Sequence, residues 1–314
     1  MRLTIQGLTK TYPGGVRALG DVNLDIGPGL FGLLGPNGAG KSTLMRTLAT
    51  LQEADAGRVY LDDIDVLRDK KAVRHLLGYL PQEFGVYPKV SAFELLDHLA
   101  GLKGIGPQHR RWQEVTALLK RTNLFEVRHR KLGTFSGGMK QRFGIAQALL
   151  GNPKLVIVDE PTAGLDPEER ERFHNLLADI GEDVIVILST HIVADVADLC
   201  PTMAVIHQGQ VVATGDPQQV AAGLKGRLWR KTLSREELAV YERTQAEKWP
   251  ILRSRRLAGR VVVHVEGDGP PDASFERVTA DLEDVYFSVI RGANGPRAAG
   301  AGPLAAATSS PPPA

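Results

Sequence analysis

Two apolar runs stand out in the middle of the chain, "LVIV" at 155–158 and "VIVIL" at 184–188. Neither run alternates with polar positions, as a strand with one solvent-facing side would. A run that is apolar at every position is typical of a central strand in a parallel sheet, which is covered on both faces. Both runs are far shorter than the ~20 residues that a membrane-spanning helix needs. We therefore expect that the chain does not cross a membrane by itself.

Further β-rich runs alternate with helical patterns over roughly the first 215 residues. Helix starts carry recognisable capping residues. "SAFE" at 91–94 fits a capping box, and "DPEE" at 166–169 and "DPQQ" at 216–219 place proline in the first turn. The other candidate strands are 3–6, 22–26, 30–34, 58–61, 203–207 and 210–213. The alternation predicts an α/β fold.

The chain divides into three parts by pattern and composition. We expect a main domain at 1–222, with a helical subdomain at about 83–150 that includes "FELLDHLAGL" and "WQEVTALLKRTNL". The segments "GRLWRKTL", "RVVVHVEG" and "TADLEDVYFSVIRG" predict a small α/β domain at 223–292, near the lower size limit for independent folding. Residues 293–314 are rich in Ala, Gly and Pro, which predicts a disordered tail.

Composition narrows the class of protein. The net charge is only +2, so a general attraction to nucleic acid is not indicated. The single cysteine, Cys200, excludes an intrachain disulfide and fits a reducing compartment, and we expect it to be packed rather than reactive. The N-terminal "MRLTIQGLTKTYPGG" lacks the apolar run of a signal peptide. The histidines and the cysteine show no zinc-ligand spacing.

A glycine-rich loop, "GPNGAGKS", follows a predicted strand and precedes a predicted helix. Its spacing matches G-x-x-x-x-G-K-[ST], a loop whose backbone N–H groups surround a phosphate. Lys41 can reach the β and γ oxygens, and the Ser42 hydroxyl can bind Mg²⁺. The residues that we expect to cradle the phosphates are Gly35, Pro36, Asn37, Gly38, Ala39, Gly40, Lys41, Ser42 and Thr43.

Polar residues follow several of the predicted strands. Asp159 and Glu160 end the first apolar run, where Asp159 can hold Mg²⁺ and Glu160 can polarise an attacking water. His191 follows the second run and is a candidate sensor of the γ-phosphate. Gln82 follows "GYLP" and can touch Mg²⁺ or that water. Tyr12, in "KTYPGG", can stack on a purine ring.

A second glycine-rich turn, "TFSGGMKQ" at 134–141, also opens a predicted helix. Exposed N–H groups at a helix start bind anions, but one nucleotide needs only one such cradle. Together the motifs resemble the nucleotide-binding subunit of ABC transporters over about residues 2–215. In that family Tyr12 corresponds to the A-loop aromatic residue, Gln82 to the Q-loop and His191 to the switch histidine.

The resemblance extends to the remaining motifs. The first glycine-rich loop corresponds to Walker A, Asp159 to the Walker B aspartate and Glu160 to the catalytic glutamate. "AGLD" at 163–166 corresponds to the D-loop and "FSGGM" at 135–139 to the signature loop. The commonest signature is LSGGQ, so Met139 lacks the polar contacts of that glutamine.

Two such subunits stack head to tail in the family, with each ATP between the Walker A loop of one and the signature loop of the other. The resemblance therefore implies that Ser136, Gly137 and Gly138 contact the ATP of a partner subunit, which explains the second cradle. It also implies a P-loop NTPase core of ABC type, a mixed sheet with flanking helices. The implied cofactors are ATP and Mg²⁺, and the implied activity is ATP hydrolysis coupled to transport.

Two segments resemble ABC-2 type exporters of drugs, antibiotics, lipids or polysaccharides, "DLEDVYFSVIRG" at 281–292 and "YLPQEFGVYPKVSAFELL" at 79–96. The expected partners are a polytopic membrane permease and a second nucleotide-binding subunit, with a homodimer favoured over a heterodimer. The expected location is cytoplasmic, peripheral on the inner face of the cell membrane. The transported substrate is expected to be determined mainly by the permease, which is another chain.

Two other classes of function stay open at this point. A soluble ABC-type ATPase acting on nucleic acid or ribosomes is favoured by the basic segments "GRLWRK" and "RSRR". It is disfavoured by the single nucleotide cassette and by the lack of sustained heptads. A binding module without hydrolysis is disfavoured by the presence of Lys41, Asp159, Glu160 and His191.

Overall fold

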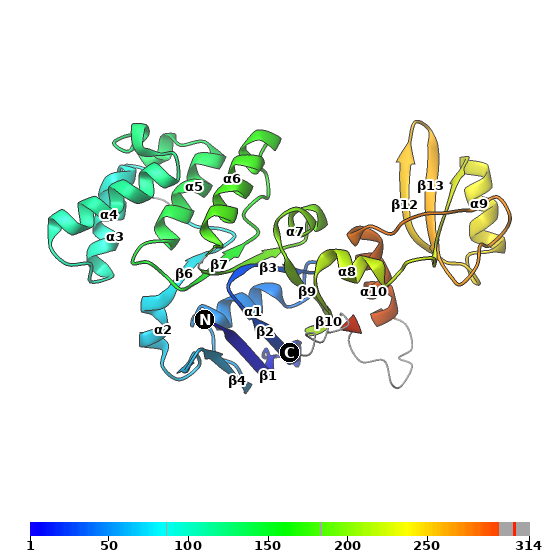
Figure 1. The fold of residues 1–314 in the computed structure, drawn as a ribbon, viewed down its shortest axis with the longest axis horizontal. Coiled ribbons are helices and arrows are strands. Elements are labelled where there is room, and N and C mark those ends of the chain that lie inside the picture. Colours follow the sequence, from blue (N-terminus) through cyan, green and yellow to red (C-terminus); the bar gives the residue numbers. More distant parts are fainter. Residues whose placement is uncertain (86, 183, 295–303, 306–314) are drawn as a thin grey trace, which may run out of the picture.

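The structure is a computed structural model that describes residues 1–85, 87–182, 184–294 and 304–305. These residues form three β-sheets with helices between and around them (Figure 1). Two of the sheets share a hydrophobic core, and the third has a core of its own. No helix in this described part of the chain is long and apolar enough to span a membrane.

The two apolar runs form neighbouring parallel strands of the central sheet, as predicted. Every residue of β7 (Leu155–Asp159) and β8 (Ile185–Thr190) is buried, as expected for strands covered on both faces. β3 (Gly29–Leu34) and β6 (Leu77–Leu80) lie parallel to them. The sheet order is β15-β10-β9-β3-β8-β7-β6, and β10 runs antiparallel to β9. The remaining strands are β9 Thr202–His207, β10 Gln210–Gly215 and β15 Leu304–Ala305.

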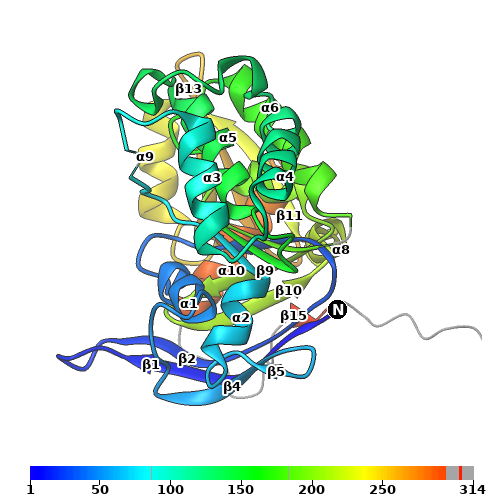
Figure 2. The same cartoon turned by 90° about the vertical axis from the view of Figure 1, so that its left-hand side faces the viewer.

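A second, antiparallel sheet packs against the central sheet through helix α1 (Lys41–Leu48), as Figure 2 shows. Alternating residues of its strand β2, such as Leu24 and Ile26, are buried in this shared core. Packing on both sides fixes α1 with its N-terminus at the carboxyl end of β3. The strands of this sheet are β1 Leu3–Thr11, β2 Arg17–Ile26, β4 Ala56–Leu61 and β5 Ile64–Asp65.

Helices cover the other face of the central sheet. The predicted capping box forms, because the Ser91 side chain accepts from the Glu94 N–H and the Glu94 carboxylate accepts from the Ser91 N–H. Asp166 and Asp216 also cap their helices as predicted. The helices of this region are α3 Ala92–Leu102, α4 Gln108–Arg121, α5 Gly137–Ala148, α6 Pro167–Ile180, α7 Val193–Leu199 and α8 Pro217–Ala222, with short 3-10 turns at Phe125–Val127 and Leu132–Thr134. Helix α2 (Lys70–Leu76) lies instead on the side of α1, in the core shared with the second sheet.

The third sheet stands at the opposite end of the molecule from α3 and α4 (Figure 1). Helix α9 (Arg235–Thr244) packs on one face of it, where Tyr241 of the helix shares a core with Trp229 and Val263 of the sheet. Its strands are β11 Leu228–Leu233, β12 Ile251–Leu257, β13 Arg260–Glu266 and β14 Glu276–Arg277, in the order β12-β13-β11-β14.

Helix α10 (Leu282–Asn294) returns from the third sheet to the main body of the molecule. Leu282 and Val285 are buried in the same hydrophobic core as Val196 of α7. Of the expected disordered tail at 293–314, only residues 293–294 and 304–305 are described, so that expectation falls mostly outside the described residues.

Candidate active site

A pocket of about 490 Å³ lies at the N-terminus of α1, beside the carboxyl edge of the central sheet. Its volume is in the range of small-molecule and cofactor sites. Among the predicted site residues, those that line the pocket are Tyr12, Pro36, Asn37, Gly38, Gly40, Lys41, Ser42, Thr43, Gln82 and Glu160. Residues that the motifs did not indicate also line it, namely Val16, Arg17, Ala18 and Gln208.

The glycines of the loop allow other parts of the backbone to approach it closely. A Cβ on Gly40 would lie 2.4 Å from the Ala18 carbonyl oxygen, and one on Gly35 would lie 2.4 Å from that of Ile206. Gly40 also has a φ of 107°, which L-residues rarely adopt. No side chain among the described residues caps the first turn of α1, so its N–H groups are available to an anion.

Lys41 is buried against its own loop and against Glu160. Its ammonium donates to the Gly35 carbonyl oxygen at 2.7 Å and to that of Pro36 at 3.3 Å. The same nitrogen lies 3.3 Å from Glu160 Oε1. A charge buried in this way requires partners, and these three oxygens supply them.

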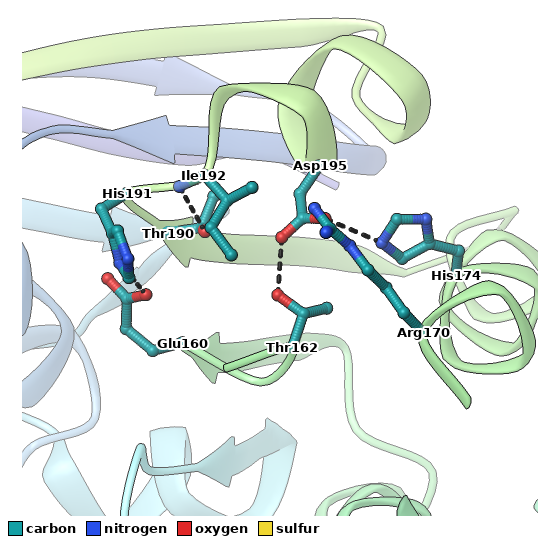
Figure 3. Close-up of polar contacts among 8 residues, drawn as sticks. All are labelled: Glu160, Thr162, Arg170, His174, Thr190, His191, Ile192 and Asp195. Atoms are coloured by element: carbon teal, nitrogen blue, oxygen red, sulfur yellow. Dashed lines mark hydrogen bonds and ion pairs between the residues drawn. The ribbon is translucent and has the colours of Figure 1, made fainter. Parts of the chain in front are cut away.

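Glu160 connects Lys41 to His191. Its backbone has a φ of 51°, which is strained for a non-glycine residue, and its N–H donates to the Ser189 carbonyl oxygen at 2.8 Å. Its Oε2 lies 2.6 Å from His191 Nδ1 (Figure 3). The described residues that line the pocket do not include His191, which reaches the site through this contact.

Asp159 is buried, and one of its carboxylate oxygens, Oδ1, has no hydrogen-bond partner among the described residues. Burial raises the pKa of Asp159, and interactions with Ser189, Lys41 and Ser42 oppose that rise. A buried carboxylate oxygen without a partner, close to the Ser42 hydroxyl, fits the oxygen ligands that Mg²⁺ prefers.

Tyr12 is held at the pocket wall by a residue that the sequence did not indicate. The Tyr12 hydroxyl donates to Gln52 Oε1 at 2.7 Å and lies 3.3 Å from Thr43 Oγ1. Gln208 comes from the turn between β9 and β10, which the neighbouring Gly209 ties to the loop by donating to the Ala39 carbonyl oxygen at 2.9 Å. No spacing in the sequence places either contact, because both join distant segments.

The second glycine-rich turn does not join this pocket. Within the described structure, Ser136, Gly137 and Gly138 are absent from the pocket lining. Ser136 caps α5 by accepting from the Met139 N–H at 3.2 Å, and Ser136 and Gly137 are exposed. Phe135 is buried, and Met139 packs against the core, so both departures from the commonest signature are packing residues here.

Comparison with known proteins identifies the family. The family described as ABC transporter matches residues 19–163. The "Uncharacterized ABC transporter ATP-binding protein YxlF" of Bacillus subtilis (strain 168) is 33% identical over 92% of this chain and 99% of its own length. The chain belongs to the ABC transporter ATP-binding proteins.

Another member of the family is matched over part of its length. The "Probable multidrug ABC transporter ATP-binding protein YbhF" of Escherichia coli (strain K12) is 31% identical over 93% of this chain. The chain spans about half of YbhF, 52% of its length.

The fold agrees with the family. The solved structure of the ATP-binding cassette MJ0796, described as a dimeric post-hydrolysis state bound to ADP and Pi, has a TM-score of 0.62 and 28% identity to this chain. The match covers 68% of this chain and 98% of that one. The predicted α/β P-loop NTPase core of ABC type, a mixed sheet with flanking helices, is confirmed.

Proposed function

We propose that this ABC protein hydrolyses ATP to energise a separate membrane permease, with Glu160 as the group that activates water. The observation that supports this most directly is the Glu160 carboxylate, which contacts both Lys41 and His191 at a P-loop pocket. A carboxylate between a phosphate-binding cation and an oriented imidazole is placed to take a proton from water beside the γ-phosphate.

In this proposal the loop at 35–43 binds the β and γ phosphates through backbone N–H groups and Lys41, while Tyr12 stacks on the adenine. The side chains that would hold Mg²⁺ are Ser42, Gln82 and Asp159. The ion would neutralise charge on the phosphate oxygens when bound.

The catalytic step is assigned to groups of this chain that already touch each other. Glu160 accepts the proton of the attacking water, and His191 orients the Glu160 carboxylate through Oε2. Because Lys41 contacts Glu160 Oε1, a triphosphate that draws Lys41 toward itself also frees Glu160 to act as a base.

We also propose that two copies close head to tail around ATP, as a homodimer. Ser136 and Gly137 are exposed at the start of α5 and outside the pocket of their own chain, which leaves them accessible to a partner's nucleotide. The related MJ0796 cassette is described as dimeric with ADP and Pi. Binding of ATP would then hold the two subunits together, and hydrolysis would release them.

Export by an ABC-2 type transporter is the direction that we propose. It is supported by the "LEDVY" segment at 282–286, which begins α10, and by the multidrug description of YbhF. The permease would bind the helical subdomain at about 83–150, where Tyr87 and Trp112 are exposed apolar side chains. The protein would then lie at the cytoplasmic face of the membrane, with residues 223–292 as an accessory domain of the main domain at 1–222.

The alternative role on nucleic acid or ribosomes is less favoured by the contacts of its basic segments. Several cations of its basic segments are paired with acids, since Arg227 contacts Glu266 and Asp268, and Arg230 contacts Glu276. Arg253 likewise contacts acidic residues of and beside α10. Cations neutralised in this way have less charge to offer a phosphate backbone.

The test is a pull-down of tagged Glu160→Gln protein from detergent-solubilised membranes in Mg-ATP, with Lys41→Ala as the matched variant that should bind ATP poorly. Recovery of a polytopic membrane protein, identified by mass spectrometry, is the expected result. Recovery of ribosomes or nucleic acid with no membrane protein would overturn the transporter role.

A further inference from the structure

A fully buried carboxylate lies behind the active site. Asp195, on α7, is 0% exposed and accepts hydrogen bonds from side chains of two other segments (Figure 3). Thr162 Oγ1 lies 2.6 Å from Asp195 Oδ2, Arg170 Nε lies 2.8 Å from Oδ1, and His174 Nε2 lies 3.0 Å from Oδ1. Both carboxylate oxygens therefore have partners, which a buried charge needs.

The residues that donate to Asp195 lie on both sides of the D-loop in the sequence. Thr162 immediately precedes the segment 163–166, and Arg170 and His174 lie on the same face of α6, which follows it. The Asp195 carboxylate therefore contacts side chains before and after the segment 163–166, which follows Glu160 closely in the sequence.

The same carboxylate belongs to the segment that carries His191. Thr190 Oγ1 accepts from the Ile192 N–H at 3.0 Å, which fixes the turn from β8 through His191 into α7 (Figure 3). His191 and Asp195 thus lie on one continuous segment, whose turn is held by this hydrogen bond. That segment is joined twice by side chains to the segment after β7, through the His191–Glu160 contact and the Asp195–Thr162 hydrogen bond.

We propose that Asp195 is a positioning residue for ATP hydrolysis. It holds the segment 160–166 against α7, so that the Glu160 carboxylate keeps its contact with His191 when Lys41 is drawn away. This inference rests on the proposed role of Glu160. The Asp195–Thr162 hydrogen bond adds a second side-chain bridge to the His191–Glu160 contact, beyond the point where the backbone hydrogen bond from the Glu160 N–H to the Ser189 carbonyl oxygen already joins the two segments.

The test compares Thr162→Val, which removes the hydroxyl at nearly constant volume, with Thr162→Ser, which retains it. Thr162→Val should lower kcat about tenfold, and Asp195→Asn should lower it about 100-fold, since small displacements of reacting groups have effects of this size. The KM for ATP and the affinity for a fluorescent ATP analogue should stay within about twofold of wild type, because the phosphate cradle is untouched. Thr162→Ser should restore most of kcat.

Asp284→Asn is the matched control. Asp284 is also a buried carboxylate, 1% exposed, and it accepts from His264 Nδ1 at 2.7 Å far from the pocket. Its substitution should lower the thermal unfolding temperature without changing kcat per folded molecule. The inference is overturned if Thr162→Val and Thr162→Ser have equal kcat, or if Asp195→Asn changes only thermal stability, as Asp284→Asn does. Absence of turnover in the wild-type chain would instead overturn the proposed function.

Discussion

Lys41 and Glu160 form a buried ion pair, with Nζ 3.3 Å from Oε1 and each side chain 6% exposed. In the proposed mechanism each group interacts with a different partner: Lys41 binds phosphate, and Glu160 takes a proton from water. The pair must therefore open when a triphosphate enters. Without ATP, the Glu160 carboxylate supplies the negative charge beside Lys41 that the γ-phosphate would supply once ATP is bound.

Replacing Glu160 should separate binding from hydrolysis. In Glu160→Gln the attraction that holds Lys41 away from phosphate is weakened, so ATP should bind at least as tightly as in wild type. Turnover should fall about 100-fold or more, the usual contribution of a general base. Steady-state ATPase assays and equilibrium titrations measure the two effects. Glu94→Gln, in the capping box of α3, is the control and should leave both unchanged; normal turnover in Glu160→Gln would rule out the base assignment.

The two glycines of the signature loop should respond differently to alanine. A Cβ on Gly138 would lie 2.2 Å from Glu169 Oε2 and disturb the contact of Glu169 with Arg142, so Gly138→Ala should lower the unfolding temperature. A Cβ on Gly137, the first residue of α5, meets nothing within 4 Å among the described residues. Gly137→Ala should therefore keep its thermal stability.

Gly137→Ala should nevertheless weaken the dimer held by ATP, because its methyl group would face the partner's phosphate. The measurement is light scattering of the Glu160→Gln protein with Mg-ATP, with and without Gly137→Ala. Undiminished dimer formation would contradict the proposed place of Gly137 at the second cradle.

The ionised Asp159 carboxylate should lower the stability of the fold in the absence of Mg²⁺, although the proposed Mg²⁺ site needs it. Because burial raises its pKa, ionisation is less favourable in the folded chain than in the unfolded one. Its contribution to folding is therefore greatest at low pH, below its unfolded pKa, and is lost as pH rises through its folded pKa. Asp159→Asn should raise the unfolding temperature at neutral pH without Mg²⁺, by about 2–4 °C for each 1 kcal/mol gained.

This gain should shrink toward pH 4, where the wild-type side chain is increasingly protonated in both states, while ATPase activity should be lost at all pH values. Thermal melts in EDTA across this pH range test the claim. Asp55→Asn is the contrasting variant, because a hydrogen bond from Lys10 lowers the pKa of Asp55 and its substitution should not stabilise the chain. An unfolding temperature unchanged by Asp159→Asn at neutral pH would show that burial does not penalise this carboxylate.

Cys200 should be unreactive in the folded chain. Burial, with a smaller effect of the Asp195 carboxylate, raises the pKa of its thiol to about 12. Only about one molecule in 10⁴ carries the thiolate at pH 8, and the thiolate is the reactive form. An aromatic disulfide reagent should label one thiol per chain in denaturant and almost none in native buffer. Rapid native labelling would mean that the core around α7 opens readily.

Local patterns predicted the elements and motifs that depend on neighbouring residues. The continuous apolar runs became β7 and β8, and the Ser91–Glu94 capping box formed because its partners are three residues apart. β12 was not predicted, because its "SRR" segment lies at an exposed sheet edge and carries no apolar alternation.

Contacts between distant segments could not be predicted in the same way. Gln52 orients Tyr12, and Asp195 holds Thr162 and Arg170, yet neither residue stands in a motif. Their roles arise only when the sheet brings β7 and β8 together and α6 and α7 pack beside them. A lone acid on a short helix gives no signal in the sequence that distinguishes it from a solvated one.

Part of the hydrophobic core can form only after helix α10, which follows the other described helices in the sequence, has been synthesised. Leu282 and Val285 complete a core that also contains Val196 and Met203, although β11 to β14 lie between these segments in the chain. A nascent chain leaving the ribosome would expose this apolar surface until α10 had been made. Chaperones that recognise exposed apolar segments would therefore meet the cassette before it could close.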